Sequence, residues 1–199
     1  MMRTVDGLWS LVRADLQRYG YGVSWRAFLR QYLLAPGFRY SCWMRLTNSL
    51  KAMGAPGYVG YVCSRIILHH YSIKYGIDMP YNATIGPGLY ISHCGGIVVS
   101  EDVVIGRDCN LNHEVTIGVK YGGKNPGCPT IGDRVYLGPG CKVIGGIVLG
   151  NDVAVGANAV VVHSLPDFAV AAGIPAKVLS LVGSSQYVVN TTHQESSSS

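Results

Sequence analysis

The chain has 199 residues, 48% of them hydrophobic, and a formal net charge of +5 at pH 7. This length and hydrophobic content suit one domain, or a domain with a cap, around a sizeable core. No apolar run of about eighteen residues is free of charge, which argues against a membrane-spanning helix. The six cysteines show no CxxC spacing and no secretory signal, so we expect reduced thiols in a cytoplasmic protein.

Residues 1–76 are predicted to form an α-helical N-terminal cap. Helical segments are expected to end at Gly20, near Pro36, at Gly54 and at Gly76, because Gly and Pro commonly terminate helices. Ser24 is a candidate N-cap for the second segment.

The positive charge is concentrated in this cap. Residues 1–75 hold ten Lys or Arg against two acidic residues, and thirteen of the nineteen aromatic residues. Residues 76–199 hold six Lys or Arg against nine acidic residues. The cap is therefore either a helical layer with a solvated basic face or a peripheral surface that meets anionic lipid or a phosphate-bearing carrier at the inner membrane face. Nucleic acid is not an expected partner, because none of the usual binding motifs occurs.

A six-residue period dominates the second half of the chain. One aliphatic column reads Ile131, Leu137, Val143, Leu149, Val155 and Val161. A second column, four residues further on, reads Val135, Cys141, Ile147, Val153, Ala159 and Leu165. A period of six fits neither a helix nor an alternating strand. It predicts a triangular coil of short parallel strands in which three hexads make one turn and each unit must stack on its neighbours.

The same register covers residues 91–118 and breaks between Val119 and Thr130, in "VKYGGKNPGCPT". The break predicts a loop extruded from the coil over residues 119–130, and such loops often carry function. We therefore expect the solenoid to span residues 77–180. Residues 181–199 are expected to be a C-terminal extension with a disordered tail, because "NTTHQESSSS" is polar and low in complexity.

Polar residues inside the repeat mark the candidate chemistry. The segment "YGIDMPYNATIGPGLYISHCGGIVVSED" places Asp78 before the coil, His93 where an apolar column is expected, and Glu101 after a glycine pair. His113 lies between the two inward columns, so its side chain is expected to face outward. The extruded loop adds a third candidate group, which is Lys120, Lys124 and Cys128.

The hexads, the segment "HCGGIVVSE" and the exit "AAGIPAKV" together resemble the serine acetyltransferase branch of the left-handed parallel β-helix acyltransferases, over roughly residues 75–180. The cap resembles that of members found in capsular and exopolysaccharide gene clusters. The resemblance implies a mainly β fold with a helical cap, a homotrimer with active sites between adjacent solenoids, and acetyl-CoA as co-substrate. A pair of trimers is a further option for the assembly, and no metal is expected.

The resemblance also assigns roles. It implies that His93 is the general base and that Asp78 supports it. An alcohol needs such a base as it attacks the thioester, and a carboxylate on the second ring nitrogen fixes the tautomer. Possible supporting residues are Ser92, Glu101, His113 and the oxyanion-binding pair Gly95 and Gly96. The expected coenzyme A contacts are Ala172, Gly173, Pro175 and Lys177. Cys94 as a covalent nucleophile is the less favoured mechanism.

Departures from the family pattern bear on the acceptor. This chain has Ser92 where the cysteine-pathway enzymes have Asp, and Gly127 and Cys128 where they have an Arg-His pair that grips the serine carboxylate. The loop supplies only Lys120 and Lys124 as cations, whereas a carboxylate favours a bidentate partner. The sequence reading therefore favours a sugar hydroxyl of capsular polysaccharide, exopolysaccharide or a lipid-linked precursor as acceptor, with L-serine as the alternative.

Two other classes stay open. One is a metalloenzyme of the γ-carbonic-anhydrase kind, which needs three histidine ligands at an interface. His93 and His113 are twenty residues apart, two more than one regular turn, and no third histidine completes a set. The other is a non-catalytic solenoid used for assembly.

Overall fold

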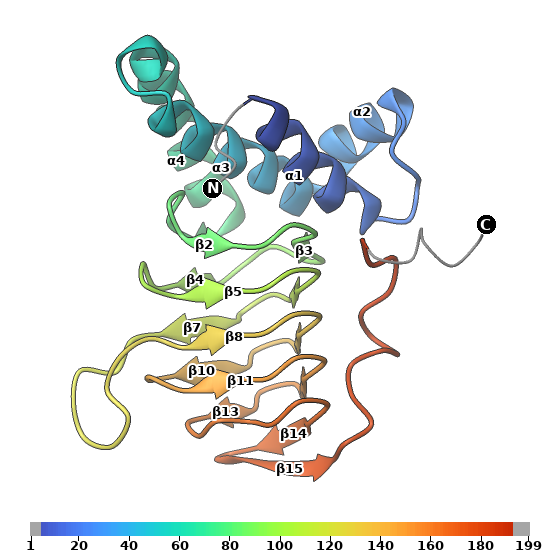
Figure 1. The fold of residues 1–199 in the computed structure, drawn as a ribbon, viewed down its shortest axis with the longest axis vertical. Coiled ribbons are helices and arrows are strands. Elements are labelled where there is room, and N and C mark those ends of the chain that lie inside the picture. Colours follow the sequence, from blue (N-terminus) through green and yellow to red (C-terminus); the bar gives the residue numbers. More distant parts are fainter. Residues whose placement is uncertain (1–4, 193–199) are drawn as a thin grey trace.

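The computed structural model describes residues 5–192. The helices are α1 (Val5–Gln17), α2 (Trp25–Leu34), α3 (Pro36–Ala52) and α4 (Tyr58–Tyr75), with a 3-10 turn η1 (Ala55–Gly57). The strands are β1 (Ile77–Asp78), β2 (Thr84–Ile85), β3 (Tyr90–Ile91), β4 (Ile97–Val99), β5 (Val104–Ile105), β6 (Asn110–Leu111), β7 (Thr116–Gly118), β8 (Thr130–Ile131), β9 (Tyr136–Leu137), β10 (Lys142–Ile144), β11 (Val148–Leu149), β12 (Ala154–Val155), β13 (Val160–Val161), β14 (Val170–Gly173) and β15 (Ala176–Ser180). Figure 1 shows the helices lying across one end of a tall stack of strands.

The strands form three sheets, and as far as β13 every third strand along the chain belongs to the same sheet. The orders are β1-β4-β7-β10-β13, β2-β5-β8-β11 and β3-β6-β9-β12-β14-β15. All pairs are parallel except the closing hairpin between β14 and β15. This is the triangular coil that the six-residue period predicts, because each side of the triangle is one short strand.

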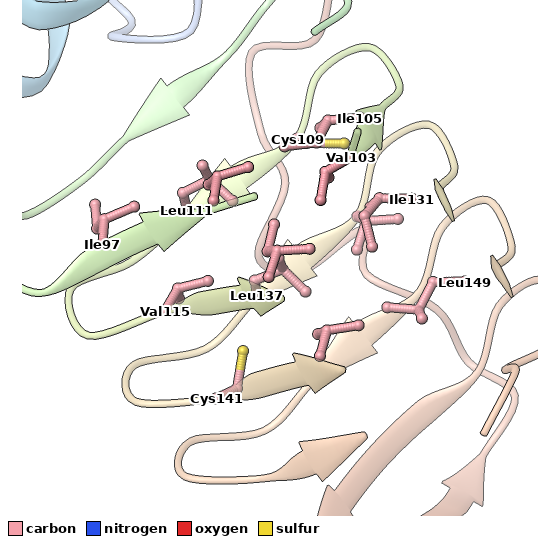
Figure 2. Close-up of a cluster of buried hydrophobic side chains, with 14 of the residues drawn as sticks. Ile97, Val103, Ile105, Cys109, Leu111, Val115, Ile131, Leu137, Cys141 and Leu149 are labelled. Carbon is pink, nitrogen blue, oxygen red and sulfur yellow. The ribbon is translucent and has the colours of Figure 1, made fainter. Parts of the chain in front are cut away.

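The aliphatic columns fill the inside of the coil (Figure 2). Leu137, Val143, Leu149 and Val155 are each fully buried. Cys109 and Cys141 lie in the same core, where burial raises the pKa of each thiol to about 12. These two cysteines are therefore small core residues and not reactive groups.

The cap is joined to the first coil by buried polar groups. The Asp15 carboxylate accepts hydrogen bonds from the Arg45 guanidinium at 3.1 Å and from the backbone N–H groups of Gly88 and Leu89. Arg45 also donates to the carbonyl of Ile85 at 2.7 Å. Two of the cap's basic and acidic residues are thus buried partners and are not part of a solvated face.

The helix α3 begins with a close approach to the coil. A Cβ at Gly37 would lie 2.4 Å from the carbonyl oxygen of Ile91, so no larger residue fits without moving one of the two segments. Further along α3, the Tyr40 hydroxyl donates to the carbonyl of Met79 at 2.9 Å. These contacts fix the cap over the turn that carries β3.

The C-terminal extension differs from the sequence expectation as far as Thr192. After β15 the chain turns back along the outside of the coil toward the cap (Figure 1). Ser184 is buried and donates to the carbonyl of Arg134, and Tyr187 stacks on Tyr136 with ring centroids 4.7 Å apart. The Thr192 hydroxyl donates to Asp108 at 2.8 Å. The polar tail "HQESSSS" lies outside the described residues.

The division into a cap of residues 1–76 and a solenoid of residues 77–180 remains a prediction about folding units. The helices hold more residues than the strands, because most sides of the coil contribute only two or three strand residues. The description "mainly β" is therefore less accurate than a β-helix with a helical cap. Among residues 5–192 we find no helix with the length and apolar content needed to cross a bilayer.

Candidate active site

His93 lies at a corner of the coil that contains two extra residues. From Ile91 to Val98 the chain takes seven steps, whereas from Leu111 to Thr116, their partners on the next coil, it takes five. We call residues 92–96 the His93 corner. The prediction that His93 takes an apolar column position is wrong, because Ile91 and Ile97 occupy the core on either side and His93 is exposed.

The glycine pair makes this corner possible. Gly95 and Gly96 have φ of 111° and 66°, values that residues with a side chain rarely adopt. A Cβ at Gly96 would also lie 3.2 Å from the Cα of Glu114 on the next coil. Within residues 5–192 no hydrogen bond uses the backbone N–H of Gly95 or Gly96. Both groups are therefore available to a ligand.

His113 lies directly below His93. The pairing of Ile91 with Leu111 puts the two histidines at the same place on successive coils. Their ring centroids are 6.0 Å apart and the rings meet edge to face at 75°. The expectation that twenty residues overshoot one turn was wrong, because the first turn of this coil itself takes twenty residues. The outward direction expected for His113 agrees with its half-exposed position.

Small residues continue the column below His113. Pro139, Ala157 and Gly173 follow it on successive coils, because Leu111, Leu137, Val155 and Ala171 are paired in register. We call His113, Pro139, Ala157 and Gly173 the corner column.

A cavity of about 180 Å³ opens beside this column, between Ala157 and the aromatic pair of Tyr136 and Tyr187. The predicted exit motif forms the lower end of the column. Ala172 and Gly173 pair with Lys177 and Ala176 across the closing hairpin, and the bond before Pro175 is cis.

Asp78 and the His93 corner border one cleft. Asp78 is exposed on β1 and pairs with Val98, and a cleft of about 600 Å³ is lined by Asp78, Gly96, Arg65 and His69 among others. Within residues 5–192 no hydrogen bond joins Asp78 to His93. Asp78 thus lies near the corner without a hydrogen bond to the histidine.

Ser92 is held by an asparagine that the sequence reading missed. The Ser92 hydroxyl donates to Asn112 Oδ1 at 2.5 Å, and Asn112 Nδ2 donates to the carbonyl of Leu137 at 2.7 Å. Asn112 is buried on the coil below Ser92. A polar residue directly after the inward Leu111 was the only signal in the sequence that could have identified it.

The other predicted residues lie apart from this corner. Glu101 is exposed in the turn between β4 and β5 and accepts a hydrogen bond from Asn82 Nδ2 at 3.1 Å. In the extruded loop, Lys120 Nζ donates to the carbonyl of Lys124 at 2.7 Å. Cys128 is half-buried against the core. Figure 1 shows the loop between β7 and β8 projecting from the coil.

The thiol beside His93 is not activated. Cys94 is half-buried, and burial raises the pKa of its thiol. A nucleophilic cysteine needs a depressed pKa, because the thiolate is the reactive form. Among residues 5–192 we also find no group of three or more His, Cys, Asp or Glu arranged to hold a metal ion.

Known proteins with similar sequences identify the family. A family described as bacterial transferase hexapeptide (six repeats) matches residues 128–163. The serine acetyltransferase of Helicobacter pylori strain J99 is 38% identical over 149 residues, which cover 74% of this chain and 83% of that enzyme. The chain belongs to the serine acetyltransferase family. The serine acetyltransferase of Mycobacterium tuberculosis is 43% identical over 106 residues, which cover 52% of this chain but only 45% of that enzyme.

A solved member of the serine acetyltransferase family confirms the fold and the co-substrate class. The Brucella abortus serine acetyltransferase in complex with coenzyme A is 29% identical, with a TM-score of 0.71 over 87% of this chain and 68% of that one. The predictions of a hexapeptide-repeat left-handed β-helix and of an acyltransferase are therefore confirmed, as is acetyl-CoA as co-substrate.

The prediction of a sugar hydroxyl as acceptor is contradicted. The relatives are serine acetyltransferases, which was the alternative, and they give no support to a role in capsule or exopolysaccharide synthesis. The departures from the family pattern at Ser92, Gly127 and Cys128 are local, whereas the similarity to the Helicobacter pylori enzyme spans 149 residues. Differences at a few acceptor-binding positions do not establish a different substrate class, because other cationic side chains are able to bind the serine carboxylate.

Proposed function

We propose that this protein transfers the acetyl group of acetyl-CoA to the hydroxyl of L-serine. The observation that carries the proposal is the similarity to the Helicobacter pylori serine acetyltransferase over 149 residues, in a chain whose exposed His93 lies one coil above the corner column. His93 acts as general base and removes the hydroxyl proton during direct attack on the thioester. The free N–H groups of Gly95 and Gly96 then bind the oxyanion.

Asp78 is proposed as a positioning residue for His93. Asp78 lines the same cleft as Gly96, which belongs to the His93 corner. Rotation of the exposed imidazole toward β1 would let the carboxylate accept a hydrogen bond from the N–H of one ring nitrogen, which fixes the tautomer and leaves the other nitrogen free to act as the base. Ser92 supports the corner through Asn112.

The corner column is proposed as the binding groove for the acyl-carrying arm of coenzyme A. With a strand spacing of about 4.8 Å, the four steps from His93 to Gly173 span about 19 Å, which suits a long extended chain. Pro139, Ala157 and Gly173 present no large side chain along this path. Lys177 is exposed at the lower end, where its ammonium would meet the phosphates of the coenzyme.

L-serine is expected to support saturable release of coenzyme A. Because this loop offers Lys120 and Lys124 in place of a bidentate guanidinium, we expect a serine KM about tenfold or more above that of relatives with an arginine, for the loss of about 1.5 kcal/mol. Thiol release should be measured with L-serine and with serinamide, which lacks the carboxylate. Equal rates with and without L-serine, in protein shown by thermal shift to bind acetyl-CoA, would overturn the proposal.

We propose that the active form is a homotrimer. The His93 corner is open to solvent in a single chain, so a neighbouring solenoid is needed to close it around two substrates. The extruded loop projects from its own coil (Figure 1), and we propose that it contacts such a neighbour. A pair of trimers joined through the caps is the larger assembly that this arrangement allows.

We also propose a cytoplasmic location with a peripheral contact between the cap and the inner face of the membrane. Along α2, Trp25, Leu29 and Leu33 are 69%, 46% and 60% exposed, at a spacing of four residues that puts them on one face. Arg26 and Arg30 are exposed beside them. Aromatic, aliphatic and basic side chains together suit an anionic interface. Two copies of this face would repel each other, because residues 7–75 hold only one acidic residue, the buried Asp15.

Replacing Arg26 and Arg30 with serine is expected to weaken binding to anionic vesicles by about 30-fold, since each basic residue near such a surface contributes about 1 kcal/mol. Co-sedimentation with phosphatidylcholine vesicles, with and without phosphatidylglycerol, measures this. A Lys124→Ser variant, which removes an exposed cation from the extruded loop, is the control. Equal binding to neutral and anionic vesicles, or a shift to a larger oligomer without vesicle binding, would contradict the membrane contact.

A further inference from the structure

We infer that His113 is a second catalytic residue, which donates the proton to the sulfur of coenzyme A as the acetyl group leaves. The inference rests on the proposed acetyl transfer. It assigns one imidazole to each end of the reaction, with His93 at the acceptor hydroxyl and His113 at the leaving thiolate.

The register of the coil carries the first step. His113 lies one coil below His93 and heads the corner column that runs down to Gly173. An acyl-carrying arm lying in that groove approaches His93 from below. Its sulfur therefore lies beside His113 when its acetyl carbon lies beside His93.

Ring geometry carries the second step. The two centroids are 6.0 Å apart and the rings meet edge to face, so their nitrogen atoms do not stack against each other. In a tetrahedral intermediate the attacking oxygen and the sulfur are bonded to one carbon, about 3 Å apart. A hydrogen bond of about 3 Å from His93 would then reach the oxygen, and one of similar length from His113 would reach the sulfur. Within residues 5–192 the His113 side chain makes no hydrogen bond, which leaves its ring nitrogens free for this role.

The proton balance is complete without a further reactant. The hydroxyl oxygen bonds to the acetyl carbon, and its proton passes to neutral His93. The carbon–sulfur bond breaks, its electron pair stays on sulfur, and the proton of the His113 imidazolium passes to that sulfur. The products are the acetyl ester and the free thiol of coenzyme A. One proton moving from His93 to His113 through solvent then restores the starting state.

The strand register places several titratable groups near His113. Cys94 and His93 lie on the coil above, and Glu114 is its neighbour in the chain. On the coil below, Lys142 Nζ donates to the Glu114 carbonyl at 2.5 Å, and Tyr136 contacts Asn112. A pH profile must therefore be read by comparing variants, because any of these groups is able to contribute to the profile of the wild type.

The test compares His113→Ala, His113→Gln and the wild type across pH with acetyl-CoA and L-serine. We expect kcat to fall about 10- to 100-fold in both variants. We also expect the alkaline decline of kcat, which reports the protonated acid, to be lost in both. His70→Ala, which removes an exposed histidine from α4, is the matched control and should retain wild-type kcat.

Each outcome has a distinct meaning. Rescue by glutamine with an unchanged alkaline decline would overturn proton donation, because glutamine donates a hydrogen bond but no proton. Turnover by His113→Ala within about twofold of wild type would overturn the inference alone. Wild type without serine-dependent turnover would overturn the proposed function together with it.

Discussion

Replacing His93 with alanine is expected to lower kcat by about 10²- to 10⁴-fold, the range typical for loss of a general base. A serine hydroxyl is a poor nucleophile while it keeps its proton, and His93 is the exposed imidazole one coil above the corner column. The affinity for acetyl-CoA is expected to change by less than about twofold, because the groove lies below the histidine. Thiol-release kinetics measure the first quantity and calorimetric titration measures the second.

Cys94→Ser is the control for this prediction. Direct transfer needs no acyl-enzyme, and burial raises the pKa of the Cys94 thiol, so the serine variant should keep most of the activity. Loss of activity in Cys94→Ser, with an acetylated thiol in the wild type, would point to a covalent route. Retention of turnover in His93→Ala would remove the general base from the mechanism.

Asp15→Asn is expected to destabilise the protein by about 3–5 kcal/mol, because it breaks a buried ion pair and leaves one charge uncompensated. Asp15 is fully buried, and its carboxylate accepts from Arg45 and from two backbone N–H groups of the first coil. The amide in its place offers one acceptor oxygen where the carboxylate offers two. The Arg45 guanidinium, 6% exposed, would then keep its charge without a counterion.

Asp152→Asn is the matched control. The Asp152 carboxylate pairs with Arg134 at 2.7 Å, but these side chains are 17% and 33% exposed. A partly solvated pair contributes about 1 kcal/mol or less, so this variant should lose far less stability. Urea unfolding of both variants against the wild type checks the difference. Equal losses would mean that the Asp15 pair is no more important to the fold than a surface pair.

The fold was predictable because its signal is periodic. The columns through Leu137 and Val143 repeat every six residues, and the structure buries them inside the coil. The break after Ile117 predicted a projecting loop, and β7 and β8 flank one. The helices also begin and end close to the expected positions, since Ser24 caps α2 through the N–H of Ala27 and Gly76 ends α4 in the left-handed conformation.

The placement of the site was harder to predict because it depends on an exception to the period. Two extra residues at the His93 corner make the first turn twenty residues long. A regular turn of eighteen residues therefore did not predict that His93 and His113 lie on the same corner of successive coils. Gly95 and Gly96 were the signal that the corner is irregular. The pairing of Asp15 with Arg45 had no such signal, because a buried ion pair leaves no repeating pattern in a sequence.

The acceptor was the least predictable feature. It depends on a few side chains, and Ser92 and Cys128 are two positions at which this chain differs from the expected family pattern. The C-terminal extension was also misjudged, since its polar composition gave no sign that Ser184 is buried or that Thr192 binds Asp108.

The most direct test of the central claim is a crystal structure of the His93→Ala variant with acetyl-CoA and L-serine bound. The variant should hold both substrates unreacted. The account predicts the coenzyme arm along Pro139 and Ala157, the thioester sulfur beside His113, and the serine hydroxyl pointing at residue 93. A thioester bound on another face of the coil, away from residue 93, would contradict it.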